Sequence, residues 1–173
     1  KGVGADGWGD YGGMGVSVLA VYDFQETRTR VFMDDNREEA IQLMRDRQVL
    51  VTYNGEGFDF PLIQHNWTRT PAGERFTDAV SIDLCALVTE QLGHRCKLDQ
   101  LLECNGIPGK TGAGAQAPLD WQAGRIGTVT DYCIADVHRT TMLFLRSLLG
   151  PLHTPNGREI ALSTPSFLNG PFV

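Results

Sequence analysis

The chain has 173 residues, which is enough for one domain with a sizeable core. Its 42% hydrophobic and 21% charged residues are typical of a globular protein, and no apolar run approaches the roughly 20 residues of a membrane-spanning helix. The formal net charge of −6 argues against a broad basic surface that follows duplex DNA. It does not exclude a metal-dependent nuclease, because the active site of such an enzyme is itself a cluster of carboxylates.

The cysteines indicate a reducing compartment. No C-x-x-C pair is present, and the cysteine spacings match no zinc module. Cys85 and Cys133 lie in apolar stretches, where a reduced, buried thiol is the expected state. The first residues show no charged segment followed by an apolar one, as a signal peptide would. We therefore expect a cytoplasmic protein that does not bind membranes.

The first elements predicted along the chain are a flexible head and a β-hairpin. Residues 1–14 are rich in glycine, which is typical of a mobile loop. β-Branched residues at 15–23 and again at 29–33, with a polar turn between them, predict two paired strands. Residues 34–36 offer N-cap side chains for an amphipathic helix that ends near Asp46.

A buried strand and two helices are predicted next. Val49–Tyr53 is short, apolar and β-branched, as in a strand buried within a parallel sheet. Pro61 suits the first turn of the helix that follows. Residues 79–83 form either a further strand or the start of a helix predicted at 84–92, which Asp83 is expected to cap.

The second half of the chain is predicted to be helical. Helices are expected at 97–104, 119–123 and 128–149, whereas residues 151–173 contain four prolines and little apolar periodicity. These patterns predict one domain at 15–150, followed by a tail. A hairpin, a helix, a buried strand and then helices is the order of a ribonuclease-H-like α/β fold, a mixed sheet flanked by helices, with its first, central strand missing.

Three polar side chains occupy positions where chemistry is expected. Asp59 follows the predicted strand Val49–Tyr53, and open α/β sheets bind ligands beyond the carboxyl ends of their strands. Asp59 is also placed to cap the helix that begins near Pro61. Tyr132 and Asp136 lie four residues apart on the last helix and so project from one face. A solvated pair with this spacing is common in helices, so the spacing alone does not decide their role.

The two candidate carboxylates stand within longer motifs. Residues 52–62 read Thr-Tyr-Asn-Gly-Glu-Gly-Phe-Asp-Phe-Pro-Leu, and residues 131–137 read Asp-Tyr-Cys-Ile-Ala-Asp-Val. This pair resembles motifs II and III of the DEDD 3'-5' exonuclease superfamily, in the branch that carries a tyrosine. That branch includes the proofreading domains of family B DNA polymerases and stand-alone bacterial and phage nucleases. The resemblance extends from about Gly12 to Leu149.

The resemblance implies an enzyme, a metal-dependent 3'-5' exonuclease that acts on the ends of single-stranded DNA or RNA. It implies that Asp59 and Asp136 ligate a pair of Mg²⁺ or Mn²⁺ ions and that Tyr132 orients the attacking water. It further implies that Asn54 and Phe58 line the groove for the 3'-terminal nucleotides. Two cations are candidate contacts to phosphates, with exposed, solvated side chains as the alternative: Lys110 and Arg125.

The first motif of the superfamily has no counterpart in this chain. It is an Asp-x-Glu sequence on the central strand, whereas the head offers only Asp6 and Asp10, four residues apart among glycines. We expect that the chain begins downstream of that strand and is inactive by itself, while the parent protein is an active exonuclease. The alternative is a catalytically inactive nucleic-acid-binding or assembly module on the same scaffold.

Overall fold

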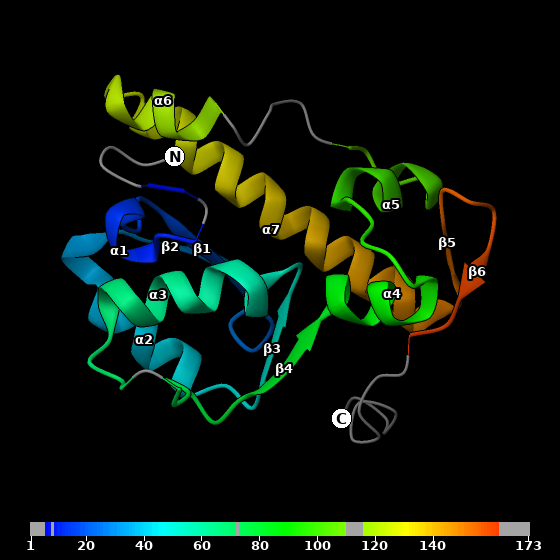
Figure 1. Cartoon of the computed structure of the whole chain (residues 1–173), viewed down its shortest axis with the longest axis horizontal. Helices are drawn as coiled ribbons and strands as arrows, with labels where there is room; N and C mark the ends of the chain where they lie inside the picture. The colour runs from blue at the N-terminus through cyan, green and yellow to red at the C-terminus, as the bar shows by residue number, and fades with distance from the viewer. Residues whose placement is uncertain (1–5, 8, 72, 110–115, 163–173) are drawn as a thin grey trace.

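The computed structural model describes residues 6–7, 9–71, 73–109 and 116–162. Within them, helices and strands are mixed along the chain, and the strands form three two-stranded sheets. The α/β class predicted from the sequence is therefore confirmed. Figure 1 shows the longest helix, α7 (Ile126–Leu149), running diagonally across the molecule, from α6 (Ala117–Gln122) at one end towards α4 (Leu84–Leu92) at the other.

The predicted hairpin is present. Strands β1 (Leu19–Asp23) and β2 (Arg28–Phe32) pair in antiparallel fashion, and β1 begins later than the β-branched pattern suggested. The helix α2 (Arg37–Arg45) follows a short 3₁₀ turn, η1 (Asp34–Asn36). The apolar face of α2 is buried in one cluster with β2 and the helix α3 (Phe60–Trp67), as its amphipathic pattern predicted.

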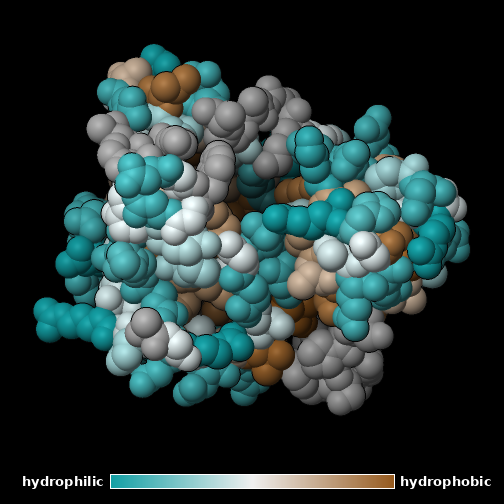
Figure 2. Space-filling view, viewed as in Figure 1, coloured by the Kyte–Doolittle hydropathy of each residue, from teal (hydrophilic) through white to brown (hydrophobic). Residues whose placement is uncertain are grey.

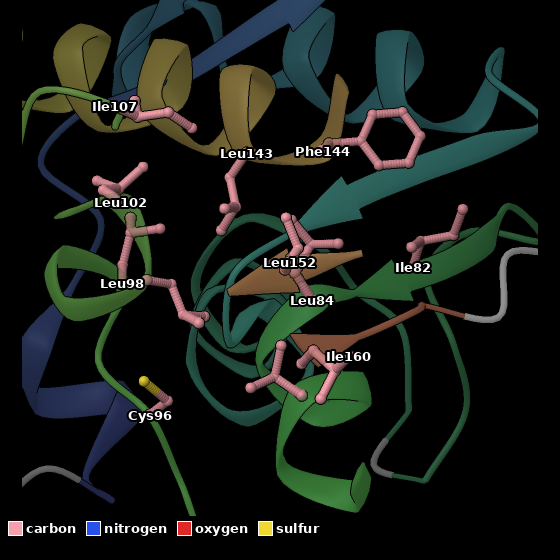
Figure 3. Packing of buried hydrophobic residues seen from close by; sticks show 12 residues of the cluster. Ile82, Leu84, Cys96, Leu98, Leu102, Ile107, Leu143, Phe144, Leu152 and Ile160 are labelled. Atoms are coloured by element: carbon pink, nitrogen blue, oxygen red, sulfur yellow. The ribbon is translucent and has the colours of Figure 1, made fainter. Parts of the chain in front are cut away.

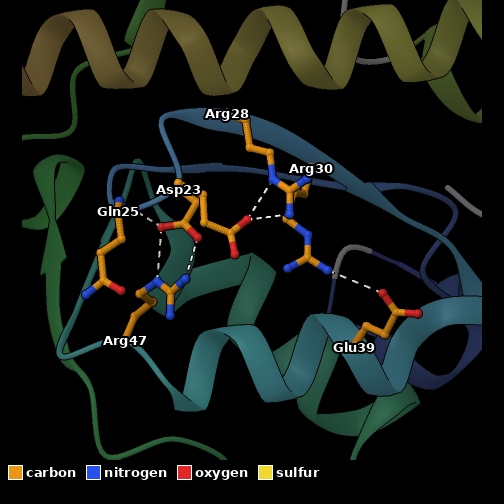
Figure 4. A network of polar contacts seen from close by, with 7 residues as sticks. Asp23, Gln25, Arg28, Arg30, Glu39 and Arg47 are labelled. Carbon is orange, nitrogen blue, oxygen red and sulfur yellow. Dashed lines mark hydrogen bonds and ion pairs between the residues drawn. The ribbon is translucent and has the colours of Figure 1, made fainter.

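A buried ion pair joins the hairpin to the segment before β3 (Val49–Thr52). Asp23, at the end of β1, is 4% exposed, and the Arg47 guanidinium donates two hydrogen bonds to its carboxylate (Figure 4). These bonds hold the pKa of Asp23 below its usual range. Figure 4 also shows Arg30 of β2 bonded to Glu39 of α2. Polar contacts thus hold the hairpin to α2 and to the segment that follows α2.

The second pair of strands is parallel. β3 pairs with β4 (Val80–Asp83), so the segment at 79–83 is a strand rather than the start of a helix. Helix α3 (Phe60–Trp67) lies in the crossover that a parallel connection requires. The prediction that β3 is buried is wrong, because all four of its residues are half-buried. Among the described residues, β4 is its one paired neighbour.

The two pairs of strands do not form one sheet within the described residues. Helix α7 contacts both β1 and β3, and so packs against the two pairs together. A single ribonuclease-H-like sheet would need a strand between β1 and β3. The ribonuclease-H-like arrangement therefore stays a prediction.

The larger hydrophobic cluster lies between α7, α4, α5 (Leu98–Cys104) and the last two strands (Figure 3). Leu143 and Phe144 reach into it from α7. The predicted tail contributes a small hairpin, β5 (Leu152–His153) with β6 (Glu159–Ile160). Leu152 is fully buried, so regular structure continues beyond residue 150. Strands of two residues are too short to produce a periodic pattern, which is why the sequence did not indicate them.

Part of the predicted head is also ordered. Residues Tyr11–Met14 form a helical turn, α1, which Asp10 caps by accepting a hydrogen bond from Gly13 N at 3.0 Å. This turn packs against α3. Hydrophilic residues cover most of the face drawn in Figure 2, and hydrophobic ones appear there in small separate groups. None of the helices in the described part of the chain combines the length and apolar character that a membrane span requires.

Candidate active site

A tight turn between β3 and α3 carries the first candidate carboxylate. Asn54 adopts the left-handed conformation, with a φ of 69°, which asparagine tolerates better than most residues. The π-helical turn η2 (Gly55–Asp59) follows it. A Cβ atom at Gly55 would lie 2.6 Å from the Thr52 side chain, and one at Gly57 would lie 2.7 Å from Asn54 Oδ1. Glycine at position 55 therefore avoids a clash with Thr52, whereas a side chain at position 57 would displace that of Asn54. π-Helical irregularities such as this turn are frequent at functional sites.

Asp59 ends this turn and does not cap the helix that follows. Its backbone is helical, with a φ of −66°, and its side chain makes no capping hydrogen bond, so the N-cap alternative is wrong. The side chain is exposed, yet protein atoms surround its carboxylate closely enough to remove part of its hydration. This desolvation raises the pKa of Asp59 to about 6, and the negative charges of Asp83 and Asp136 raise it further. Three carboxylates therefore converge at the end of the β3–β4 pair.

The second candidate carboxylate comes from α7. Asp136 lies close enough to Asp59 for the two charges to repel each other. Cys133, one helical turn earlier, lies near both carboxylates. Burial raises the pKa of its thiol to about 11, and the negative charges of Asp59 and Asp136 raise it further. Arg139 Nη1 lies 3.4 Å from Asp136 Oδ1. Tyr132 is half-buried on the same helix, one turn before Asp136.

Asp83 joins the two halves of the site. As predicted, it caps α4, because its carboxylate accepts hydrogen bonds from Cys85 N and Ala86 N. The same carboxylate also accepts from Asn54 N and Glu56 N, in the turn that leads to Asp59. The sequence did not indicate this second role. The register of the parallel strands, which sets Thr52 opposite Asp83, was the missing information.

A hollow of about 580 Å³ lies beside the turn, on the side of α3. Aromatic and cationic side chains contribute to its lining: Tyr11, Phe60, His65, Arg69 and Arg75. The Tyr11 hydroxyl donates a hydrogen bond to Gly57 O at 3.1 Å, and its ring meets that of Phe58 edge-on, with centroids 6.4 Å apart. The predicted residues Asn54 and Phe58 are thus part of the turn that borders this hollow.

Of the two predicted phosphate contacts, Arg125 is not brought to the carboxylates. Arg125 is bonded to Asp120, with Nη2 2.6 Å from Oδ1, and its side chain is 52% exposed. It precedes Asp136 by about three helical turns, or roughly 16 Å along the helix axis. Lys110 lies outside the described residues.

The donors of Asp59 and Asp136 suit a hard divalent cation, because carboxylate oxygens are the ligands that Mg²⁺ and Mn²⁺ prefer. Across the ranges that the structure describes, no group of three or more His, Cys, Asp and Glu side chains is arranged to hold a metal ion. The nearby Asp83 carboxylate is already engaged by four backbone N–H groups. The described residues therefore fit one weakly held cation and do not by themselves fit a pair.

The chain also matches a protein family over its second half. Residues 71–153 fit the model of that family, which covers the helix with Tyr132 and Asp136. The match is to predicted 3'-5' exonucleases related to the exonuclease domain of PolB. This confirms the resemblance to the DEDD 3'-5' exonucleases seen in the sequence motifs. The exonuclease match covers just under half of the chain and begins after Asp59. Among curated proteins, none matches the chain.

Proposed function

We propose that this chain is part of a metal-dependent 3'-5' exonuclease that acts on single-stranded DNA or RNA ends. The observation that carries the proposal is that Asp59 and Asp136, 77 residues apart in the sequence, lie close enough to repel each other electrostatically. Such repulsion destabilises the folded chain, and a bound cation would offset it. In this proposal the strand pairs belong to a ribonuclease-H-like sheet.

Each residue of the site then has a distinct task. Asp59 and Asp136 would hold Mg²⁺ or Mn²⁺, and the bound cation would polarise a phosphoryl oxygen. Tyr132 would hold the attacking water by its hydroxyl, one helical turn from Asp136. Asn54 and Phe58 would contact the 3'-terminal nucleotides.

A single strand fits the surroundings of the site better than a duplex does. The net charge of −6 argues against a broad basic surface, but the hollow beside the turn combines aromatic rings with Arg69 and Arg75. Rings that stack on bases and cations that meet phosphates are the usual means of holding single strands without sequence preference. Lys110 and Arg125 would contact phosphates farther from the reacting end.

A second candidate function is that of a catalytically inactive nucleic-acid-binding or assembly module. It is favoured by one observation, that the described residues contain no group of three metal-ligating side chains. Such a module would bind a labelled single strand and release no nucleotide from it. The exonuclease and the inactive module are therefore separated by one assay of the full-length protein with Mg²⁺ or Mn²⁺.

The decisive variants are Asp59→Asn and Asp136→Asn in the full-length protein. Each should abolish the cation-dependent release of 3' mononucleotides from a labelled single strand, because each removes a charged ligand. Asp131→Asn is the matched control, since Asp131 is exposed on the same helix as Asp136. The assignment of the site is wrong if either ligand variant degrades the strand at the rate of the parent protein.

A further inference from the structure

We propose that Asp83 is a positioning residue, whose carboxylate ties the turn that carries Asp59 to the end of β4 and thereby keeps Asp59 facing Asp136. This inference rests on the proposed function, because it concerns the geometry of a proposed cation ligand. It adds Asp83 to the residues of the site, whereas the sequence indicated only that Asp83 caps α4.

One carboxylate receives four backbone N–H groups from two separate segments. Asp83 is 7% exposed, so water has little access to these donors. Its Oδ1 accepts from Asn54 N at 2.8 Å and from Cys85 N at 3.0 Å. Ala86 N donates to the same oxygen at 3.3 Å, while Oδ2 accepts from Glu56 N at 3.1 Å. The side chain is therefore the point at which the turn and the start of α4 meet.

The capping of α4 does not by itself require aspartate. Serine, threonine or asparagine caps a helix about as well, because one side-chain oxygen is enough. Asn54 N shares Oδ1 with the two capping groups, but Glu56 N donates to Oδ2 and so requires a second acceptor, and only a carboxylate accepts on both arms. An asparagine at position 83 that kept its oxygen at the Oδ1 position would set its NH₂ group against Glu56 N.

The turn needs this anchor because the candidate ligands repel each other. Glu56 N belongs to the same π-helical turn as Asp59, three residues before it. Without a bound cation, the negative charges of Asp136 and Asp59 repel each other. Asp83 adds its own negative charge to this repulsion, so its contribution to the site is geometric rather than electrostatic. A turn released from Asp83 is expected to let Asp59 move away from Asp136.

Two substitutions in the full-length protein separate positioning from capping. Asp83→Ser keeps one oxygen for the N-terminus of α4 and removes the second oxygen, which accepts from Glu56 N in the turn. Asp83→Asn keeps the volume of the side chain and one acceptor, and it serves if the serine variant fails to fold. Asn105→Ser is the control for a general loss of stability, because Asn105 makes three hydrogen bonds to the backbone of α5 and β5.

Four quantities are measured on each variant: the melting temperature, the Mn²⁺ affinity by calorimetry, kcat and KM on a labelled single strand, and hydrogen exchange at the amides of Asn54 and Glu56. For Asp83→Ser we expect Mn²⁺ affinity and kcat to fall about 10- to 100-fold, as for other residues that orient metal ligands, with KM nearly unchanged. Exchange at the Glu56 amide should accelerate. Asn105→Ser should lower only the melting temperature.

The inference is overturned if Asp83→Ser keeps the parent's Mn²⁺ affinity, kcat and amide exchange while only its melting temperature falls. The behaviour of the parent protein tests the proposed function separately. If the parent protein neither binds Mn²⁺ nor degrades the strand, the exonuclease proposal fails. Amide exchange at Glu56 then still decides the role of Asp83: faster exchange in the variant supports it, and unchanged exchange refutes it.

Discussion

Asp59→Asn should make the protein more stable at neutral pH, although it removes a proposed cation ligand. Desolvation, followed by the charges of Asp83 and Asp136, raises the pKa of Asp59 from 3.8 to about 6 in the folded state. In the unfolded chain this carboxyl has its ordinary pKa, so between about pH 4 and pH 6 the folded state binds more protons. The contribution of Asp59 to stability is therefore complete below about pH 4 and is lost as the pH rises through 6.

The magnitude follows from the size of the pKa shift. A shift of about two units corresponds to roughly 3 kcal/mol of differential stability. Because the Asp59 side chain is exposed, solvent screening reduces this value, and we expect about 1 kcal/mol. Asparagine at position 59 cannot ionise, so the variant does not lose this free energy of folding at neutral pH. For a domain of this size, about 1 kcal/mol raises Tm by roughly 2–4 °C.

The assay is thermal and urea denaturation of the parent and Asp59→Asn between pH 4 and pH 8, without divalent cations. The stability difference should be near zero at pH 4 and reach its full value above pH 6. Asp131→Asn, at an exposed position of α7, is the control for the loss of a carboxylate elsewhere on the molecule. Added Mn²⁺ should stabilise the parent more than the variant, because binding to the folded state alone raises its stability. An Asp59→Asn variant that is less stable than the parent at pH 7 would refute the reasoning.

Two further predictions concern the chemistry of the site. Tyr132→Phe removes one hydroxyl and leaves both carboxylates, so kcat on a labelled single strand should fall by about 10²–10⁴ while Mn²⁺ affinity stays the same; an unchanged kcat would reduce Tyr132 to a packing residue. Residues 1–173 alone should bind no tightly held pair of Mn²⁺ ions and show no nuclease activity, because Asp59 and Asp136 offer two carboxylates where paired ions usually take about four. Calorimetry tests this, and tight two-site binding by the chain alone would point to further ligands among Asp6, Asp10 and Glu56. Adding an upstream strand with Asp-x-Glu should restore both binding and activity.

The sequence by itself determined the elements whose causes are local. The hairpin, α2 and α7 follow from alternation, amphipathic periodicity and capping side chains, all of which act over a few residues. Asp83 was correctly predicted to cap α4 for the same reason, since a cap involves only the residues next to it. The turn that carries Asp59 also has a local cause, because Gly55 avoids a clash with the side chain of Thr52, three residues earlier.

Only the tertiary structure decided which of these elements meet. The parallel register of β3 and β4 brings Asp83 to the amides of Asn54 and Glu56, and no local pattern encodes a register between strands so far apart in the sequence. The packing of α7 sets Asp136 against Asp59, and their mutual repulsion exists only once the chain has folded. Arg125 was a free candidate in the sequence, but the structure pairs it with Asp120, because the turn between α6 and α7 brings the two side chains together.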